Sequence, residues 1–222
     1  TVDGDNPDWD SDYDIGGANI DTRNGIIARY TTGQYDMRVE RVTAKNFYMT
    51  GIYSTGPGSV FTDVTVQNVQ GDTTYALGIG GNVEEISDSS IAHTTIAIGL
   101  ESDEEVLVDD NTISDARSGI LSYNSGVGEQ ITNNVISACK PSGFGIVISS
   151  NRGAVNVANN QVAGCNMGLS VAGSAFTTTP VTFTNNSVTL TGSPTGSYGV
   201  YLTTNKHLIG GTGSVSANFT DN

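Results

Sequence analysis

Two carboxylates near the middle of the chain have the spacing of a catalytic acid and base. Glu101 and Asp103 are two residues apart, and an extended strand would place both side chains on one side with Cα atoms about 6.5–7 Å apart. An inverting glycosidase leaves a similar gap between its two carboxyl groups for the attacking water. Four more acids follow between positions 104 and 110. A solvated acidic surface and a calcium site are therefore alternative interpretations.

A second group of acids lies near the start of the chain. Asp10, Asp12 and Asp14, with Asp21 further on, resemble the alternating oxygen ligands of a calcium-binding loop. The sixth position of that loop is Ile15 instead of the expected Gly. The alternative is a solvated acidic lead-in over residues 1–17. Ca²⁺ is the one cofactor that the sequence suggests, and the expected fold does not require it.

Carboxylates can act together only if regular elements position them, and an internal repeat supplies these elements. Seven segments at nearly equal spacing along the chain can be superimposed so that two columns are apolar throughout. The first column is Val39, Phe61, Ile86, Val108, Ile131, Val157 and Phe183. The second, five residues further on, is Ala44, Val66, Ile91, Ile113, Ile136, Val162 and Val188.

Two further marks repeat with these columns. A series of Asn side chains precedes the second column, and a stacked Asn is expected to bond its equivalent one layer away. Its members are Asn111, Asn134, Asn160 and Asn186, and Asn218 is expected to continue it. A Gly followed by Ile, Leu or Val closes each repeat, as in Gly51-Ile52, Gly78-Ile79, Gly99-Leu100 and Gly119-Ile120. Three short strands per repeat predict an all-β parallel β-helix.

Three runs in the second half of the chain show the repeat most clearly: ITNNVISACKPSGFGIVI, VANNQVAGCNMGLSV and FTNNSVTLTGSPTGSYGVYL. They resemble the repeats of the pectin-lyase-like superfamily of right-handed β-helices, which covers polysaccharide lyases, polygalacturonase-type hydrolases and phage tailspikes. The resemblance implies a single-stranded right-handed parallel β-helix over residues 18–222, with seven to eight rungs of roughly 20–31 residues each. It also implies an outer face on which sugar chains bind. It does not define a reaction, because one fold supports several chemistries.

Strand alternation then predicts two outward columns after the Gly-Ile mark. One contains Ile27, Tyr53, Gly80, Glu101, Leu121, Val147, Ser170 and Tyr201, and its apolar members are expected to be exposed. The other contains Arg29, Thr55, Asn82, Asp103, Tyr123, Ser149, Ala172 and Thr203. Asn82 and Tyr123 are expected on either side of Asp103, and with Tyr53 and Arg29 they form the expected sugar-binding surface. Arg29 is the one cation in these columns, which favours hydrolysis over elimination.

Cys139 and Cys165 are separated along the chain by the local repeat length. They are therefore expected on adjacent rungs with Cα atoms about 5 Å apart, within disulfide range. The alternative is a pair of small buried hydrophobic residues. In both cases the expected role is structural.

Charge limits the partners. The formal net charge of −14 repels nucleic acid, and no apolar run approaches the roughly 20 residues of a membrane span, so no membrane insertion is expected. The resulting hypothesis is an extracellular or virion-surface β-helix that recognises a polysaccharide, with hydrolysis at Glu101 and Asp103. The alternative is a non-catalytic structural or adhesion β-helix, stabilised as a homotrimer or by calcium.

Overall fold

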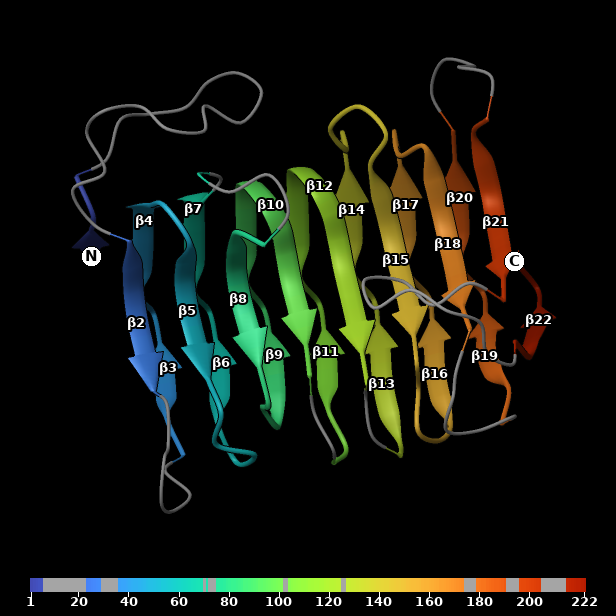
Figure 1. Ribbon diagram of the computed structural model, residues 1–222, viewed down its shortest axis with the longest axis horizontal. Coiled ribbons are helices and arrows are strands. Elements are labelled where there is room, and N and C mark those ends of the chain that lie inside the picture. The colour runs from blue at the N-terminus through green and yellow to red at the C-terminus, as the bar shows by residue number, and fades with distance from the viewer. Residues whose placement is uncertain are drawn as a thin grey trace.

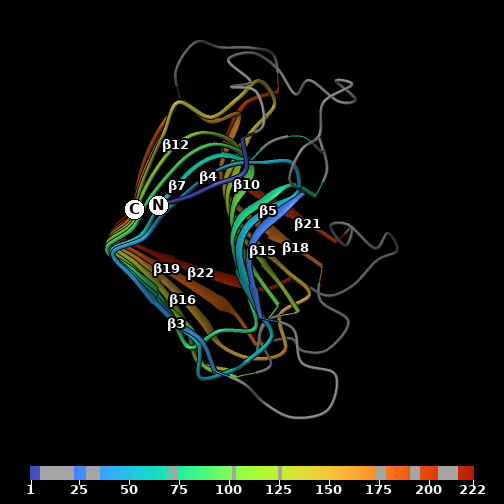
Figure 2. The same cartoon turned by 90° about the vertical axis from the view of Figure 1, so that its left-hand side faces the viewer.

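The computed structural model describes residues 1–5, 23–28, 36–69, 71, 75–101, 104–124, 127–173, 179–190, 196–204 and 215–222. Within these ranges the regular elements are β-strands, and all of their pairings are parallel. The strands lie side by side along the long axis of the molecule (Figure 1), and the view down that axis shows a triangular coil (Figure 2). The predicted all-β parallel solenoid is confirmed.

Three faces enclose the interior. Face 1 is an 8-stranded sheet of β3 (Arg38–Glu40), β6 (Val60–Thr62), β9 (Glu85–Ser87), β11 (Leu107–Asp109), β13 (Glu129–Thr132), β16 (Val155–Ala158), β19 (Val181–Thr184) and β22 (Ala217–Thr220). Face 2 holds β1 (Val2–Asp3), β4 (Thr43–Phe47), β7 (Thr65–Val69), β14 (Val135–Ser137), β17 (Gln161–Ala163) and β20 (Ser187–Thr189). Face 3 holds β2 (Asn24–Ala28), β5 (Thr50–Ser54), β8 (Leu77–Gly81), β15 (Phe144–Ser149), β18 (Met167–Ala172) and β21 (Tyr198–Thr203).

Two long strands join faces 2 and 3. β10 (Ser90–Leu100) and β12 (Thr112–Tyr123) run through both faces, so that these form one 14-stranded sheet. Where the structure describes the connection in other layers, as between β4 and β5 or between β14 and β15, a turn separates the two faces. Residues 2 and 3 pair with Ala44 and Lys45 of β4, so the first residues of the chain already belong to face 2.

The two apolar columns of the repeat form the interior. On face 1, Val39 pairs with Phe61 and the column continues layer by layer to Phe183. On face 2, Ile113 pairs with Ile136, which pairs with Val162. These residues are almost fully buried and belong to one hydrophobic core. Burial of aliphatic ladders on every layer is what stabilises a solenoid, because one layer alone cannot bury its apolar side.

The stacked Asn side chains lie at the sharp corner between faces 1 and 2. The Asn134 side-chain N–H donates to Asn160 Oδ1 at 2.9 Å, and Asn160 donates to Asn186 in the same way. The residue before each stacked Asn is left-handed, as Asn133 and Asn159 show with φ of 56° and 58°. This conformation turns the chain sharply, and Asn is among the few non-Gly residues that adopt it readily.

The predicted end of this ladder is wrong by four residues. Asn186 donates to Asn222 Oδ1 at 2.8 Å, whereas Asn218 pairs with Thr182 on the exposed side of β22. The number of residues between the first apolar column and the Asn decides which Asn joins the ladder. Phe219 continues that column beyond Phe183, and the stacked Asn follows the column residue by three positions, as in Phe183 and Asn186.

The repeated Gly at the start of face 3 allows close contact between layers. A Cβ on Gly51 would lie 2.5 Å from the Gly78 carbonyl oxygen, and a Cβ on Gly145 would lie 2.5 Å from that of Gly168. In the layer of β10 this position is taken by Ala97, whose carbonyl oxygen would lie 2.7 Å from a Cβ on Gly78. The expected Gly99-Leu100 mark is therefore wrong by two residues.

Candidate functional site

The outer surface of face 3 carries a groove of about 460 Å³. Its lining comes from four successive layers, those of β5, β8, β10 and β12, and includes Met49, Thr50, Tyr53, Tyr75, Leu77, Ile96, Gly99, Leu100, Glu101, Leu121 and Tyr123. Three of the predicted site residues, Tyr53, Glu101 and Tyr123, are therefore brought together. Asn82 is half-buried in the layer between those of Tyr53 and Glu101 and is outside the lining set.

The register of β10 places Glu101 two residues away from its predicted position. Ile98 pairs with both Ile79 and Ile120, and Gly99 pairs with Gly80 and Leu121. Gly99 thus occupies the first outward column, where Glu101 was expected. The repeated Gly favours Gly99, next to Leu100, as the start of the face 3 strand. The sheet instead aligns Ile98 with Ile79 and Ile120, because these side chains fill the interior.

Glu101 consequently lies in the second outward column, in the position that was expected for Asp103. Its backbone N–H donates to the Gly81 carbonyl oxygen at 3.0 Å, as the Asn82 N–H donates to Ser54 at 2.9 Å one layer earlier. This pattern aligns Glu101 with Asn82, and the pairing of Leu100 with Ser122 aligns it with Tyr123. Asp103 and Arg29 lie outside the described residues.

Three aromatic side chains line the groove together with Glu101. Tyr53 is on β5, Tyr123 ends β12, and Tyr75 lies just before β8. Tyr75 is 60% exposed, whereas Tyr53 and Tyr123 are half-buried. The repeat pattern of the sequence does not identify Tyr75, because this residue lies in a turn outside the repeating columns. Its position just ahead of the face 3 strand that contains Gly78-Ile79 is the sequence signal that could have identified it.

The floor of the groove is apolar. Leu121 and Val147 were expected to be exposed, but they are only 4% and 1% exposed. With Ile96 they form a small cluster separate from the interior core, and Leu77 and Phe144 pack against it. The expectation fails because outward aliphatic side chains on adjacent layers bury one another. The groove therefore presents tyrosines above an apolar base.

The electrostatic character of the groove is simple. Glu101 is exposed and is the one charged residue among its described lining side chains. Glu104 and Glu105 are also exposed and follow closely in the sequence. An exposed carboxylate can accept hydrogen bonds from a ligand's hydroxyl groups or transfer a proton.

A second, polar hollow of about 300 Å³ lies on face 2 and is lined by Lys45, Asn46, Gln67, Asn68, Ala92 and His93. Several of its polar side chains are already bonded, to one another or to acids beside the hollow. Lys45 Nζ lies 2.9 Å from Asp3 Oδ2, and the Asn68 amide donates to Asn46 Oδ1 at 2.9 Å. His93 Nδ1 lies 2.5 Å from Asp115 Oδ2. This network stabilises the corner between layers and competes with any ligand.

Asp10, Asp12 and Asp14 lie outside the described residues, so the calcium prediction is not addressed by the geometry. Elsewhere in the described chain, no three His, Cys, Asp or Glu side chains are grouped as metal ligands would be. Among the described residues, one acid is buried. Glu129 lies inside the solenoid at the start of β13, where the Ser122 hydroxyl donates to its carboxylate at 2.7 Å.

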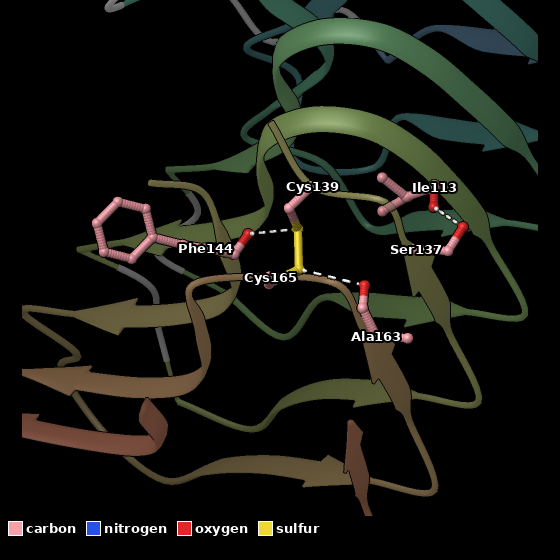
Figure 3. Close-up of a disulfide and its surroundings, with 6 residues drawn as sticks. All are labelled: Ile113, Ser137, Cys139, Phe144, Ala163 and Cys165. Atoms are coloured by element: carbon pink, nitrogen blue, oxygen red, sulfur yellow. Dashed lines mark hydrogen bonds between the residues drawn. A yellow bond between two sulfur atoms is a disulfide. The ribbon is translucent and has the colours of Figure 1, made fainter. Parts of the chain in front are cut away.

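Cys139 and Cys165 form a disulfide with a Cα–Cα distance of 4.7 Å. It joins successive turns between faces 2 and 3, where Figure 3 shows the two sulfur atoms between the Phe144 and Ala163 carbonyl groups. Cys139 Sγ lies 3.7 Å from the Phe144 oxygen. This is a packing contact, because a disulfide sulfur carries no proton to donate. The role of the cysteines is structural.

Comparison with known proteins defines the family. No curated protein and no solved structure matches the chain. In the described part of the chain, no helix has the length and apolar character needed to cross a bilayer. A family model described as a right-handed beta helix region matches residues 24–188, which is most of the sequence. With the parallel triangular coil described above, this match shows that the chain belongs to the right-handed β-helix family.

Proposed function

We propose that this β-helix recognises a polysaccharide in the groove on face 3. The observation that carries the proposal is that Tyr53, Tyr75 and Tyr123 line one groove together with Glu101. A pyranose ring has apolar C–H faces that stack on aromatic rings, and its hydroxyl groups donate to carboxylates. Binding sites commonly combine mostly apolar walls with a few polar groups that orient the ligand.

The charge of the site defines the class of glycan. The chain has a formal net charge of −14, and the described lining residues contain no Lys or Arg. A polyuronate would be repelled unless a cation intervened. We therefore expect a neutral or amino-sugar polysaccharide, and this expectation separates the site from one that eliminates across a uronate.

Hydrolysis is a second candidate activity, and the position of Glu101 favours it. The carboxylate lies in the groove between the layers of Asn82 and Tyr123, where a glycosidic oxygen would be within its reach. An inverting reaction requires a second carboxylate to activate water, and Asp103 is the proposed partner. One group protonates the leaving oxygen, the other removes a proton from the attacking water, and the C–O bond breaks as the new one forms.

The proposed setting is extracellular, on a secreted protein or a virion. The Cys139–Cys165 disulfide supports this, since disulfides persist mainly in oxidising compartments. Membership of the pectin-lyase-like superfamily is part of the same proposal. The alternative is a structural or adhesion role with homotrimer formation or a calcium site at Asp10, Asp12 and Asp14. A chelator that lowers the melting temperature would support the calcium site, and an unchanged melting temperature would contradict it.

A glycan array followed by a reducing-end assay tests the proposal. The expected result is binding to neutral or amino-sugar oligosaccharides. For hydrolysis, Glu101→Gln and Asp103→Asn should each abolish reducing-end release without changing the melting temperature. Full release by both variants would contradict the catalytic assignment alone, whereas the absence of binding to any glycan would contradict the recognition site.

A further inference from the structure

The groove on face 3 opens where two successive layers lack a side chain in the first outward column. Between Tyr53 and Leu121 this column holds Gly80 and Gly99. A Cβ on Gly99 would lie 2.8 Å from Leu77 Cδ1, so a side chain at this position would project into the groove. The opening between Tyr53 and Leu121 spans three layer spacings, or about 14 Å between their backbones. It leaves room for a sugar residue between the two side chains.

Tyrosines lie in the layers on both sides of Glu101. A Cβ on Gly81 would be 3.1 Å from Tyr53 Cε2, so the Tyr53 ring leans over Gly81 in the next layer. The Glu101 backbone N–H donates to the Gly81 carbonyl oxygen at 3.0 Å, which places Glu101 one layer beyond that ring. On the other side, Tyr123 follows Glu101 by one layer in the second outward column. Tyr75 lines the same groove.

Tyrosine faces and a carboxylate attract the same kind of group. The face of an aromatic ring attracts a cation that lies within about 6 Å of its centroid, and a carboxylate pairs with an ammonium group. The described lining residues include no Lys or Arg that would compete for these contacts. A groove lined by three tyrosines, one glutamate and aliphatic side chains therefore suits a ligand with a positive charge better than a neutral ligand.

The layers that form the groove carry much of the negative charge of the chain. Residues 75–124 contain ten acids and one base, Arg117, so their formal net charge is −9 of the total −14. Glu104 and Glu105, which follow the groove residue Glu101 closely, are exposed. A field of one sign raises the local concentration of ligands of the opposite sign and their rate of association. The surroundings of the groove thus favour a cationic ligand as its lining does.

From these observations we propose that the groove binds an amino-sugar polysaccharide whose amino groups are free, with one ammonium group at Glu101 between the tyrosines. The inference rests on the proposed glycan recognition and narrows the ligand class from neutral or amino sugars to cationic ones. The C–H faces of the sugar ring pack on the aliphatic floor around Leu77 and Leu121. Acetylation of the amine removes its charge, so free and N-acetylated forms of one oligosaccharide differ in the property that the groove recognises.

Calorimetric titration with two matched oligosaccharides tests this specificity. The probes are linear hexasaccharides of glucosamine and of N-acetylglucosamine with the same linkage. The wild type should bind the glucosamine hexasaccharide roughly 10-fold more tightly, because the ammonium gains contacts with one carboxylate and with tyrosine faces. This ratio of affinities should fall as salt is added, since salt screens the charges.

Matched variants locate the recognition of charge. Glu101→Gln keeps the shape of the side chain and should lower the ratio of the two affinities roughly 4-fold. Glu84→Gln is the control, because Glu84 is exposed and outside the lining of the groove; it removes the same charge and should leave the ratio unchanged. Tyr53→Leu should lower the ratio roughly 2- to 3-fold, whereas Tyr53→Phe keeps the ring face and should preserve it.

The possible results separate this inference from glycan recognition itself. Equal affinities of the wild type for the two hexasaccharides would overturn the inference and leave glycan recognition intact. Binding of neither hexasaccharide, while another glycan on the array is bound, would have the same meaning. A preference for the glucosamine form that Glu101→Gln leaves unchanged would contradict the placement of the ammonium group. The absence of binding to every glycan would contradict glycan recognition and the inference together.

Discussion

Asn160 Oδ1 accepts two hydrogen bonds from Asn134, one from the backbone N–H and one from the side-chain amide, both at 2.9 Å. The Asn160 amide also donates to the Ile131 carbonyl oxygen at 2.9 Å. Both side chains are fully buried. The two residues are 26 positions apart, so this contact joins adjacent layers at the corner between faces 1 and 2.

Replacement of Asn160 by Ala should therefore lower the free energy of unfolding by about 3 kcal/mol, because several buried polar groups lose their partners. Urea denaturation measures the change. Asn218→Ala is the matched control, since Asn218 is exposed on β22, and it should change stability by less than about 0.5 kcal/mol. Equal losses for the two variants would contradict the ladder.

Gly145→Ala should destabilise the protein by about 3 kcal/mol through overpacking. The new Cβ would lie 2.4 Å from Val162 Cγ1 and 2.5 Å from the Gly168 oxygen. Gly199 occupies the same column in the last layer, where the nearest atom would be 4.0 Å away. Gly199→Ala should therefore leave the stability unchanged. Thermal melting of both variants checks this, and a normal melting temperature for Gly145→Ala would contradict the close stacking.

Removal of the disulfide by Cys139→Ala/Cys165→Ala should cost about 3.5 kcal/mol, because the unfolded chain regains the entropy of a 26-residue loop. The wild type in reducing buffer should show the same loss, and the double variant should not respond to reductant. Denaturation curves with and without reductant measure both effects. A wild type that is insensitive to reductant would show that the cysteines are not paired.

Asp3 should titrate at unusually low pH. Hydrogen bonds from the Lys45 ammonium, the Asp5 backbone N–H and the Asn46 amide lower the pKa of its carboxyl group from 3.8 to about 2. A depressed pKa in the folded state contributes stability above the unfolded value, and this contribution is lost as the pH falls from about 4 to 2.

Carbon-detected NMR titration of Asp3 measures this pKa directly. Lys45→Met should raise it, because the largest cause of the shift is removed. Asp3→Asn should remove this contribution to the pH dependence of stability between pH 4 and 2. A carboxyl group with an ordinary pKa in the wild type would contradict the contact between Asp3 and Lys45.

The interior of the fold could be predicted from sequence because its period is carried by side chains that must stack. Ile113, Ile136 and Val162 keep a fixed offset from the first column on every layer. The register of face 3 was harder to predict from the sequence, because the number of residues between faces 2 and 3 differs from layer to layer. Along the chain, Ile79 is nearly twice as far from Val66 as Ile120 is from Ile113.

The error at Glu101 has a specific cause. The repeated Gly of face 3 favours Gly99, although Ile98 follows Ile91 at the same spacing at which Ile120 follows Ile113. β10 and β12 are both continuous strands, so equal spacing was the correct guide. The groove itself could only be predicted in part, because Tyr75 belongs to a turn and the burial of Leu121 depends on contacts between layers.

Glycan binding by tyrosine variants tests the central claim most directly. The measurement is calorimetric titration of the best oligosaccharide into wild type, Tyr53→Ala/Tyr123→Ala and Tyr198→Ala, the last being a control because Tyr198 lies outside the lining of the groove. Each lost stacking contact should weaken binding roughly 2- to 10-fold, so the double variant should bind up to about 100-fold more weakly, and Tyr198→Ala should bind as the wild type does. Unchanged affinity in the double variant would contradict the assignment of the groove on face 3 as the binding site.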